Sequence, residues 1–540
     1  MLKPNIEQSR ILDAVSSPDK RVFAINALAG TGKTTTLELL ANGPLADKAI
    51  TYVTFNARAA KEARGKFGRN TLAQTAHSHA WRSRYPGDSR TMSEVFAERL
   101  TQGSLYGDIA LIAENAQGWA SSFMRAASLL GMGRFGWRAG ILPILQVVDS
   151  FCKSSRAHIS VDDVPSALKA RAVLAGAGKN LDVLVREAEK LWTAQIDPNS
   201  DVPISHGTYL KLASLDPEPF SSNIVFFDEA QDASAPMLAM IDAHVARGGT
   251  LVMVGDKYQH IYAWAGAMNA IDAFAHKYGN DSIVLPLCQS YRFGEDIADA
   301  GNLFLSALNA EYRLAGLGAK GSCQHDGSAG VVLFRSNLKM ITEILAAHKA
   351  APERRFHVVG GTGEMVAVLG DLADLYAGKI PKTGDLAGFA SWEELSEFAE
   401  TSMGSSYAPL VNLVEMRKGA VTSVIMTLKQ SQARAEDADV VLSTAHKAKG
   451  AQWQSVRLSQ EFQTAWENAV AVDRTTGGIS RLMPESEEIT LQYVAATRAK
   501  QTLVHAGLIP KVIDHLNGAG FSRARFQHSA FLERSEARGA

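Results

Sequence analysis

A glycine-rich segment near the start of the chain has the residue types and the spacing that bind phosphate. Its sequence is Ala27-Leu28-Ala29-Gly30-Thr31-Gly32-Lys33-Thr34. It follows an apolar run at 22–25 and opens a helical pattern at 34–43, so backbone N–H groups and a helix amino end would surround an anion. Lys33 would reach the β and γ phosphates, and the hydroxyl of Thr34 would bind Mg2+. The segment predicts a nucleoside triphosphate site, with Ala27 where the general pattern has its first glycine.

A second chemical signal is a pair of carboxylates far downstream. Asp228 and Glu229 follow the apolar run at 224–227. Two adjacent carboxylates at the end of a buried strand are costly unless a cation or a catalytic task compensates them. Asp228 would hold Mg2+ through water, and Glu229 would orient or deprotonate the attacking water. The pair alone is equally compatible with an ordinary loop, but together with the phosphate segment it predicts ATP hydrolysis.

A local excess of positive charge predicts contact with nucleic acid. Residues 58–84 carry seven Lys or Arg side chains against one acid, a net charge of +6, whereas the whole chain has a net charge of −1. Aromatic and hydroxyl side chains interleave with these cations, among them Phe55, His77 and Trp81. Phosphates bind to such a basic stripe, and bases stack on aromatic faces. A solvated helix face would carry the same charges, so the aromatic residues favour a confined, salt-sensitive groove.

Rigid elements must position these residues, and the apolar pattern supplies candidates. Seven short apolar runs are typical of strands buried on both faces, and helical patterns separate them. This alternation predicts an α/β fold with parallel sheets. Two long stretches, 81–206 and 370–435, have helical spacing and few strand signals, so we expect helical insertions there. The seven expected strands are 22–25, 50–53, 224–227, 251–254, 331–334, 356–359 and 440–442.

Length and composition set the class of protein. A chain of 540 residues is expected to form three or four units of roughly 150 residues each. Its 46% hydrophobic and 21% charged residues exclude an intrinsically disordered chain. Three scattered cysteines without a CxxC pair argue against a zinc site or a disulfide framework and favour a reducing cytoplasm. No apolar run reaches the roughly 18 residues that a membrane span needs, so no membrane partner is expected.

Ten short motifs follow one another along most of the chain. They are Gln8 in PNIEQSRI, the phosphate segment, 54–63 (TFNARAAKEA), 75–81 (TAHSHAW), 228–232 (DEAQD), 255–267 (GDKYQHIYAWAGA), 289–293 (QSYRF), 334–337 (FRSN), 443–453 (STAHKAKGAQW) and 493–500 (YVAATRAK). In this order they resemble the superfamily 1 DNA helicases of the UvrD/Rep/PcrA type. Further likeness at 150–154, 204–212 and 358–361 points to the F-box DNA helicase branch, without the F-box itself.

The resemblance implies a domain organisation. The fold would be two RecA-like P-loop NTPase domains with ATP at their interface, each interrupted by a mainly helical insertion. The first domain would comprise 1–80 and 207–286, with its insertion at 81–206. The second would comprise 287–369 and 436–540, with a small insertion at 370–435.

The resemblance also implies roles for residues that spacing alone does not single out. Gln8 would read the adenine edge, and Tyr291 would stack on the adenine ring. Gln259 would sense the γ phosphate, and two arginine fingers would grip its oxygens, because a guanidinium stays charged. The expected catalytic set is Lys33, Asp228, Glu229, Gln259, Arg292 and Arg498, with Thr34 and Asp228 for Mg2+. The expected ATP-binding set is Gln8, Ala29, Gly30, Thr31, Gly32, Lys33, Thr34, Thr35, Tyr291, Arg292, Gly450, Gln452 and Arg498.

For single-stranded DNA, the resemblance implies two stacking platforms, Phe55 and Trp264, with backbone contacts from the second domain. The expected DNA-binding set is Phe55, Asn56, Arg58, His77, Tyr262, Trp264, Thr444, His446 and Lys447. Three departures from the family pattern indicate a divergent member. They are Ala265 in place of an arginine, Gln452 in place of a glutamate, and Lys257 in place of a proline or an acid.

The activity that the resemblance implies is that of an ATP-dependent DNA helicase. It would use ATP and Mg2+, translocate 3′→5′ on single-stranded DNA, act at single-strand/duplex junctions, and serve DNA repair or recombination in the cytoplasm. Two alternatives stay open. One is a translocase that strips proteins from DNA and unwinds little, and the other is a nucleotide switch or helicase subunit of a nuclease or anti-phage defence complex. Protein partners in repair or defence are unidentified.

Overall fold

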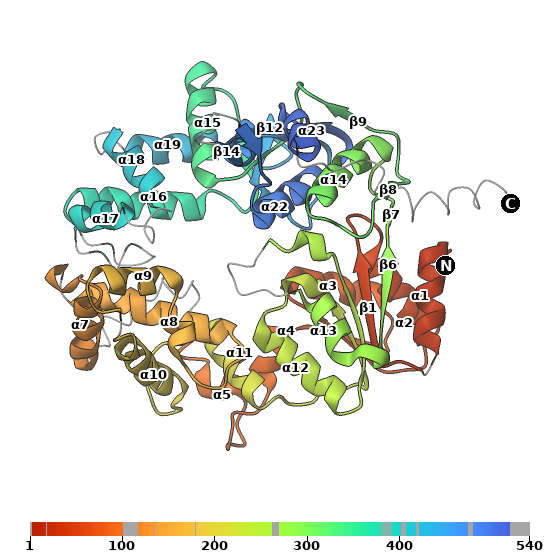
Figure 1. Ribbon diagram of the computed structural model, residues 1–540, viewed down its shortest axis with the longest axis horizontal. Helices are drawn as coiled ribbons and strands as arrows, with labels where there is room; N and C mark the ends of the chain where they lie inside the picture. Colours follow the sequence, from red (N-terminus) through yellow and green to blue (C-terminus); the bar gives the residue numbers. More distant parts are fainter. Residues whose placement is uncertain are drawn as a thin grey trace.

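Two six-stranded parallel sheets, each with helices on both faces, form the framework of the molecule. We call each of these sheets, together with the helices that cover it, a sheet unit. Figure 1 shows the two sheet units one above the other, with two groups of helices beside them. The α/β fold class expected from the sequence is therefore confirmed. The computed structural model describes residues 3–17, 19–100, 117–135, 137–178, 180–261, 269–379, 381, 386, 389, 391–400, 407–416, 421–472 and 479–518.

The first sheet carries the phosphate segment and the carboxylate pair. Its order is β3-β2-β4-β5-β1-β6, and every neighbouring pair is parallel. Because parallel strands end at the same edge, the residues that follow β1 and β4 lie close together, with only β5 between them. The strands are β1 Val22–Ala27, β2 Ile50–Thr54, β3 Thr71–Thr75, β4 Ile224–Asp228, β5 Thr250–Gly255 and β6 Ser282–Leu287.

Helices cover both faces of this sheet. Helices α1, α2 and α3 pack on one face in a cluster with Phe23, Tyr52 and Phe226, whereas α4, α11, α12 and α13 pack on the other in a cluster with Val22 and Ala24. Strands β1 and β2 are buried along their whole length, as continuous apolar runs require. The helices are α1 Ile6–Ser16, α2 Lys33–Asn42, α3 Ala57–Lys66, α4 Ala76–Arg82, α11 His206–Leu215, α12 Ala235–Ala246 and α13 Ala270–Tyr278.

The second sheet repeats this architecture, with the order β11-β12-β10-β13-β16-β9 and parallel pairs throughout. Helices α14, α22 and α23 cover one face. Helix α15, with α16 (Gly363–Tyr376) and α19 (Val421–Ser431), covers the other. The strands are β9 Ser322–Gln324, β10 Val331–Phe334, β11 Phe356–Val358, β12 Val440–Thr444, β13 Trp453–Leu458 and β16 Ala499–Val504. The helices are α14 Glu295–Ala307, α15 Asn337–Ala350, α20 Ala445–Ala448, α21 Thr464–Asn468, α22 Ser486–Ala496 and α23 Leu508–Gly518.

The apolar core continues from one sheet unit into the other. Leu28 and Ala29 of the phosphate segment, with Tyr258 and Ile261, belong to the same buried cluster as residues of α14 and α22. All four are less than one-tenth exposed. Burial of this surface favours contact between the two units at the point where the phosphate segment lies.

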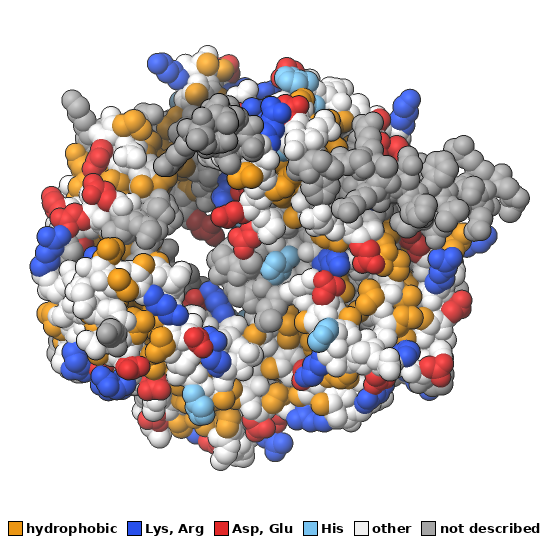
Figure 2. Space-filling view, viewed as in Figure 1, with side chains coloured by type: hydrophobic (Ala, Val, Ile, Leu, Met, Phe, Trp, Pro, Cys, Tyr) orange, Lys and Arg blue, Asp and Glu red, His pale blue; other side chains and the backbone are white. Residues whose placement is uncertain are grey.

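Two groups of helices extend from the sheets and face each other (Figure 1). Arg134 of the first group forms an ion pair with Glu397 of the second. Figure 2 shows that this face of the molecule is hollowed near its middle, and that cationic and anionic side chains are scattered over it rather than gathered in one broad basic patch. The helices are α5 Met92–Phe96, α7 Ala120–Leu129, α8 Ile141–Lys153, α9 Ser166–Leu174, α10 Asp182–Ile196, α16 Gly363–Tyr376, α17 Trp392–Ala399, α18 Ala408–Met416 and α19 Val421–Ser431.

All seven strands expected from apolar runs are present, and the described parts of 81–206 and 370–435 contain helices and no strand of a sheet. Five strands of the two sheets were not expected: β3, β6, β9, β13 and β16. Two short pairs, β7 Gln289–Ser290 with β8 Ala315–Gly316 and β14 Val470–Val472 with β15 Ile479–Arg481, lie outside the main sheets. Within the described residues, no helix is long and apolar enough to cross a membrane.

Candidate functional site

The phosphate segment forms a tight turn between β1 and α2. Gly30 and Gly32 have φ of 76° and 84°, a left-handed backbone that favours glycine. A Cβ on Gly30 would lie 2.5 Å from Ser290 Oγ and 2.6 Å from Arg292 Cβ, so only glycine fits against the second unit. Helix α2 begins at Lys33 without a side-chain cap. Its first N–H groups therefore point into a site suited to an anion.

Other residues of this segment have bonds within the protein. The N–H of Ala29 donates to Tyr493 Oη at 3.2 Å, and the hydroxyl of Thr31 donates to the carbonyl of Leu28 at 2.8 Å. Thr35 lies in the first turn of α2. The structure thus places these expected ATP-binding residues in the turn, with the N–H of Ala29 already engaged.

Asp228, at the end of β4, lies against the phosphate segment. It accepts hydrogen bonds from Tyr52 Oη at 2.6 Å and from Thr34 Oγ1 at 3.3 Å. Burial, and then the charge of Glu229, raise the pKa of Asp228 to about 6. A divalent cation would compensate this buried carboxylate, and hydroxyl and carboxylate oxygens are ligands that Mg2+ prefers. The two residues expected to hold Mg2+ therefore fit that ion.

Glu229 adopts a left-handed backbone with φ of 55°, uncommon for a residue other than glycine. Its Oε2 accepts a hydrogen bond from Gln231 Nε2 at 2.6 Å. Burial works to raise the pKa of Glu229, but the charges of Lys33 and Lys449 outweigh it and lower the pKa. The carboxylate is held ionised and oriented, as a residue that activates water requires.

Gln259 lies at the end of a short 3-10 turn after β5. Its Nε2 donates to Asp256 Oδ2 at 2.8 Å, and its Oε1 accepts from Arg498 Nη2 at 3.1 Å. Both ends of the amide are therefore used, one by the first sheet unit and one by the second. Such an amide responds when either unit moves.

The two expected arginine fingers lie close together at this interface. Arg498 is 1% exposed and donates to the carbonyl of Val494 at 2.8 Å, while Arg292 donates to the carbonyl of Thr497 at 2.9 Å. Burial, and then the charge of Arg292, lower the pKa of Arg498 to about 9. Arg292 Nε has no hydrogen-bond partner among the described residues. Two neighbouring guanidiniums, one buried and one half-buried, with a buried donor that is unused indicate a site for an anion.

A buried ion pair joins the two sheet units beside these arginines. Lys449 Nζ lies 2.6 Å from Asp232 Oδ1, with 10% and 6% of the two side chains exposed. The same ammonium donates to the carbonyl of Gln259 at 2.6 Å. Burial raises the pKa of Asp232, and Lys449 opposes that effect. The pair fixes the contact between the carboxylate motif of the first unit and the 443–453 segment of the second.

The residues expected at the adenine lie together at the amino end of α1. Gln8 accepts from the N–H of Asn5 at 3.0 Å, and its Nε2 donates to Thr36 Oγ1 of α2 at 3.2 Å. Asn5 Nδ2 also donates to the hydroxyl of Tyr291, whose ring is half exposed. The structure therefore brings Gln8, Tyr291 and the phosphate segment to one place.

Two other expected ATP contacts lie at the edge of this cluster. Gly450 has φ of 83°, and nothing lies within 4 Å of where its Cβ would be. Gln452 is exposed. The structure does not bring Gln452 into the buried cluster, although the intervening carbonyl of Ala451 accepts from Arg498 at 3.5 Å.

An aromatic cluster follows the end of β2 on the expected DNA track. Phe55 is 45% exposed, and its ring centroid lies 6.2 Å from that of His77. His77 in turn contacts His206 and Tyr209 of α11 at 6.1 and 6.2 Å. Burial, and then the charge of His206, lower the pKa of His77 to about 4, so its ring is neutral at ordinary pH. The cluster offers exposed ring surface rather than charge.

The basic stripe beside this cluster is partly neutralised. Asn56 caps α3 by accepting from the N–H of Arg58, and Arg58 Nε pairs with Glu62 Oε1 at 2.8 Å. Arg84 pairs at 2.7 Å with Glu218, which lies outside the stripe. The net charge of the stripe in space is therefore smaller than its sequence indicates.

The expected DNA contacts of the second unit lie at the start of α20. Thr444 caps this helix, and its hydroxyl accepts from the N–H of Lys447 at 3.3 Å. Lys447 Nζ pairs with Glu364 Oε2 at 2.7 Å. Burial, and then the charge of Arg335, lower the pKa of His446. Three further residues, Tyr262, Trp264 and Ala265, lie outside the described residues.

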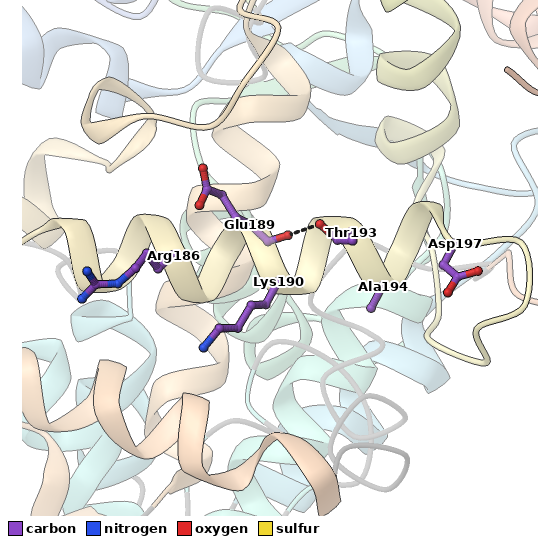
Figure 3. A pocket seen from close by; sticks show the side chains of 6 residues that line it. All are labelled: Arg186, Glu189, Lys190, Thr193, Ala194 and Asp197. Carbon is purple, nitrogen blue, oxygen red and sulfur yellow. Dashed lines mark hydrogen bonds between the residues drawn. The ribbon is translucent and has the colours of Figure 1, made fainter. Parts of the chain in front are cut away.

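A separate hollow of about 510 Å³ lies along α10 (Figure 3). Its lining residues are Arg186, Glu189, Lys190, Thr193, Ala194 and Asp197. All come from this helix and the residue after it, and Thr193 Oγ1 is already bonded to the carbonyl of Glu189. None belongs to a motif, so this hollow is distinct from the nucleotide site.

Several residues of the site were not expected from the sequence. Tyr52 lies inside an apolar strand pattern, which carries no functional signal. Asp232, Asp256, Lys449 and Tyr493 stand inside the motifs, so their positions could have suggested a role. Their long-range partners could not be inferred, because those bonds join segments that are far apart in sequence.

Family comparisons agree with this geometry. Residues 11–265 match the family model of an AAA domain, and residues 378–506 match that of the UvrD-like helicase C-terminal domain. The first match contains the phosphate segment and the carboxylate pair, and the second contains Lys449 and Arg498. The two matches therefore supply the two sides of the buried cluster.

Similar proteins extend over most of the chain. F-box DNA helicase 1 of Gallus gallus is 27% identical over 94% of this chain and 49% of its own length. F-box DNA helicase protein 1 of Schizosaccharomyces pombe is 26% identical over 94% of this chain and 58% of its own length. The ATP-dependent DNA helicase PcrA of Leuconostoc citreum is 37% identical over 15% of this chain and 11% of its own. The chain spans about half the length of the two F-box relatives.

The cross-unit ion pair gives a stability prediction. Lys449→Met leaves Asp232 buried without its partner, so we expect the free energy of unfolding in urea to fall by about 3–5 kcal/mol. Asp232→Asn combined with Lys449→Met should cost less than the two single changes together, because no uncompensated charge remains.

A matched control is Lys339→Met, which removes the half-exposed pair with Glu343 on α15. That change should cost about 0.5 kcal/mol or less. A loss for Lys449→Met no greater than the loss for Lys339→Met contradicts a structural role for the buried pair.

Proposed function

The chain is a UvrD-like superfamily 1 helicase related to the F-box DNA helicase branch, and from this premise we propose that it is an ATP-driven motor on DNA. The proposed activity is 3′→5′ translocation on single-stranded DNA with unwinding at duplex junctions, in repair or recombination in the cytoplasm. The proposal includes the two RecA-like domains and two insertions, with the boundaries expected from the sequence.

One observation supports this proposal above the others. The first sheet unit contributes the phosphate segment, the carboxylate pair and Gln259. The second contributes Arg292, Arg498 and Lys449, and all of these residues lie in one cluster. A nucleotide bound there would touch both units at once. Hydrolysis could then change the contact between them, which is what a motor requires.

Each residue of the cluster has a distinct part in the proposed chemistry. Lys33 and the N–H groups of α2 would hold the phosphates. Thr34 and Asp228 would hold Mg2+, which would polarise the phosphoryl oxygens. Glu229 accepts a proton from the attacking water. The positively charged arginine side chains would stabilise the negative charge on the γ phosphate in the transition state.

The proposed DNA track runs over the same edge of the sheets. Phe55, with Trp264, would stack on successive bases, while Thr444 and Lys447 would hold phosphates on the other side. The pairing of Lys447 with Glu364 means that a phosphate must displace a carboxylate there. Binding would therefore depend on salt and on a few contacts rather than on a broadly basic surface.

Glu229→Gln tests the proposed chemistry. We expect it to lower the rate of ATP turnover by at least about a hundredfold, because a general base contributes that much, while the affinity for ATP is retained. Lys33→Ala should lose both ATP turnover and the affinity for ATP. Turnover is followed by phosphate release and affinity by a fluorescent ATP analogue.

The control for both changes is Glu343→Gln, which removes the same charge from a half-exposed side chain on α15. It should leave turnover unchanged. Normal turnover in Glu229→Gln would assign the catalytic base to another residue.

Phe55→Ala tests the proposed track. Loss of one stacking platform should weaken binding of single-stranded DNA by about 1–3 kcal/mol, and Trp264→Ala should do the same. Fluorescence anisotropy with a labelled oligonucleotide measures the effect. Leu174→Ala, at an exposed apolar side chain on α9, is the control and should bind normally. Unchanged binding in Phe55→Ala would make this ring a packing residue.

The function itself is tested by ATP turnover with and without single-stranded DNA, followed by strand displacement on 3′-tailed and 5′-tailed duplexes. We expect DNA to stimulate turnover and the 3′-tailed duplex to be unwound. Preference for the 5′ tail overturns the polarity. Stimulated turnover that removes streptavidin from biotinylated DNA without unwinding indicates a protein-stripping translocase, and turnover insensitive to DNA contradicts a motor.

A further inference from the structure

Tyr493 links the phosphate segment to the second sheet unit in a way that no motif role explains. It lies on α22, its side chain is fully buried, and its hydroxyl reaches across the interface. The N–H of Ala29 donates to Tyr493 Oη at 3.2 Å, and this hydroxyl donates to Asp256 Oδ2, also at 3.2 Å. Both partners belong to the first unit.

Asp256 connects Tyr493 to the side-chain amide of Gln259. The carboxylate is fully buried and also accepts from Gln259 Nε2 at 2.8 Å. Gln259 Oε1 accepts in turn from Arg498 Nη2 at 3.1 Å. An unbroken series of hydrogen bonds therefore runs from the backbone of the phosphate segment through Tyr493 to Arg498.

The geometry makes the hydroxyl, rather than the ring alone, the important part of Tyr493. A buried phenol needs a hydrogen-bond partner, and this one has two. Without the hydroxyl, the N–H of Ala29 and one oxygen of Asp256 would each lose a partner at a buried position. Burial, and then the charge of Asp256, raise the pKa of Tyr493, so the hydroxyl remains a donor.

We propose that Tyr493 is a positioning residue for ATP hydrolysis, which transmits the conformation of the phosphate segment to Gln259 and Arg498. The inference rests on the proposed ATPase function. Phosphate binding draws the segment toward the ligand and shifts the N–H of Ala29. Because Tyr493 and Arg498 lie five positions apart, within and just after α22, the shift moves the arginine together with the tyrosine.

Tyr493→Phe removes the hydroxyl and keeps the ring. We expect the turnover rate of DNA-stimulated ATP hydrolysis to fall by about tenfold or more, as loss of one buried bond to a charged group predicts, with the KM for ATP changed by less than about twofold. Binding of single-stranded DNA without nucleotide should be normal. This separation of turnover from KM is not expected of a residue that only packs.

Tyr278→Phe is the matched control, because it also removes a phenol–carboxylate bond, to Asp242 at 2.8 Å, but far from the nucleotide site on α13. Its turnover should equal that of the wild type. Asp256→Asn examines the same connection from the carboxylate side. The double variant Tyr493→Phe/Asp256→Asn should turn over no more slowly than the slower single variant, since both changes break one series of bonds.

The outcomes separate this inference from the proposed function. Wild-type protein without DNA-stimulated turnover contradicts the function. Wild-type activity together with normal turnover in Tyr493→Phe overturns the inference alone. The inference is also overturned if the losses of turnover rate in the two single variants multiply in the double variant. It is likewise overturned if the melting temperature falls far more in Tyr493→Phe than in Tyr278→Phe while turnover per folded molecule is unchanged.

Discussion

Three buried carboxylates at one end of the first sheet need compensation, and the second sheet unit provides it for two of them. The three are Asp228, Asp232 and Asp256. Lys449 pairs with Asp232, and Tyr493 donates to Asp256. Buried charged groups are tolerated only with partners, so the first unit alone would be left with unfavourable groups at this surface. The contact between the units and the geometry of the site therefore depend on the same residues.

Asp228 is the carboxylate that the second unit does not reach. Its hydrogen bonds come from Tyr52, from Thr34 and from the backbone N–H of Glu229, all of its own unit. The charge of Lys33 opposes the rise, but the pKa of Asp228 is still raised to about 6. A divalent cation would compensate the carboxylate further, which is why we propose Mg2+ there. The apolar cluster that includes Leu28 and Ala29 holds the phosphate segment against the second unit. A nucleotide that enters this contact must alter it, and this links ligand binding to movement between the units.

Much of the fold could be predicted because its central strands are continuous apolar runs. Strands outside that pattern could not. Strand β6 lies at an edge and contains Pro286, which removes a backbone donor and is tolerated only there. Strand β3, with the sequence TLAQT, is also at an edge and only partly buried, so its pattern is weak. Edge strands experience less burial, and their sequences therefore carry less information. Strands β13 and β16 lie inside the second sheet, but polar residues interrupt their apolar pattern and hide them as well.

In the site, too, some features could be predicted from the local sequence and others could not. The left-handed turns at Gly30 and Gly32 are a local property, and the glycines predict them. The pairing of Lys449 with Asp232 joins residues 217 positions apart, and the fold alone brings them together. The sequence overstates the net charge of the basic stripe, because Glu218, far along the chain, pairs with Arg84. Residue types can be predicted from motifs, whereas partners require the folded chain.

If both sheet units form one nucleotide site, a bound nucleotide must protect helices of both. Hydrogen–deuterium exchange with and without a non-hydrolysable ATP analogue and Mg2+ measures that protection. We expect slower exchange both in α2, behind the phosphate segment, and in α22, which carries Tyr493 and leads to Arg498. Protection confined to α2 and the first sheet, with α22 unchanged, would contradict a nucleotide site formed by both units.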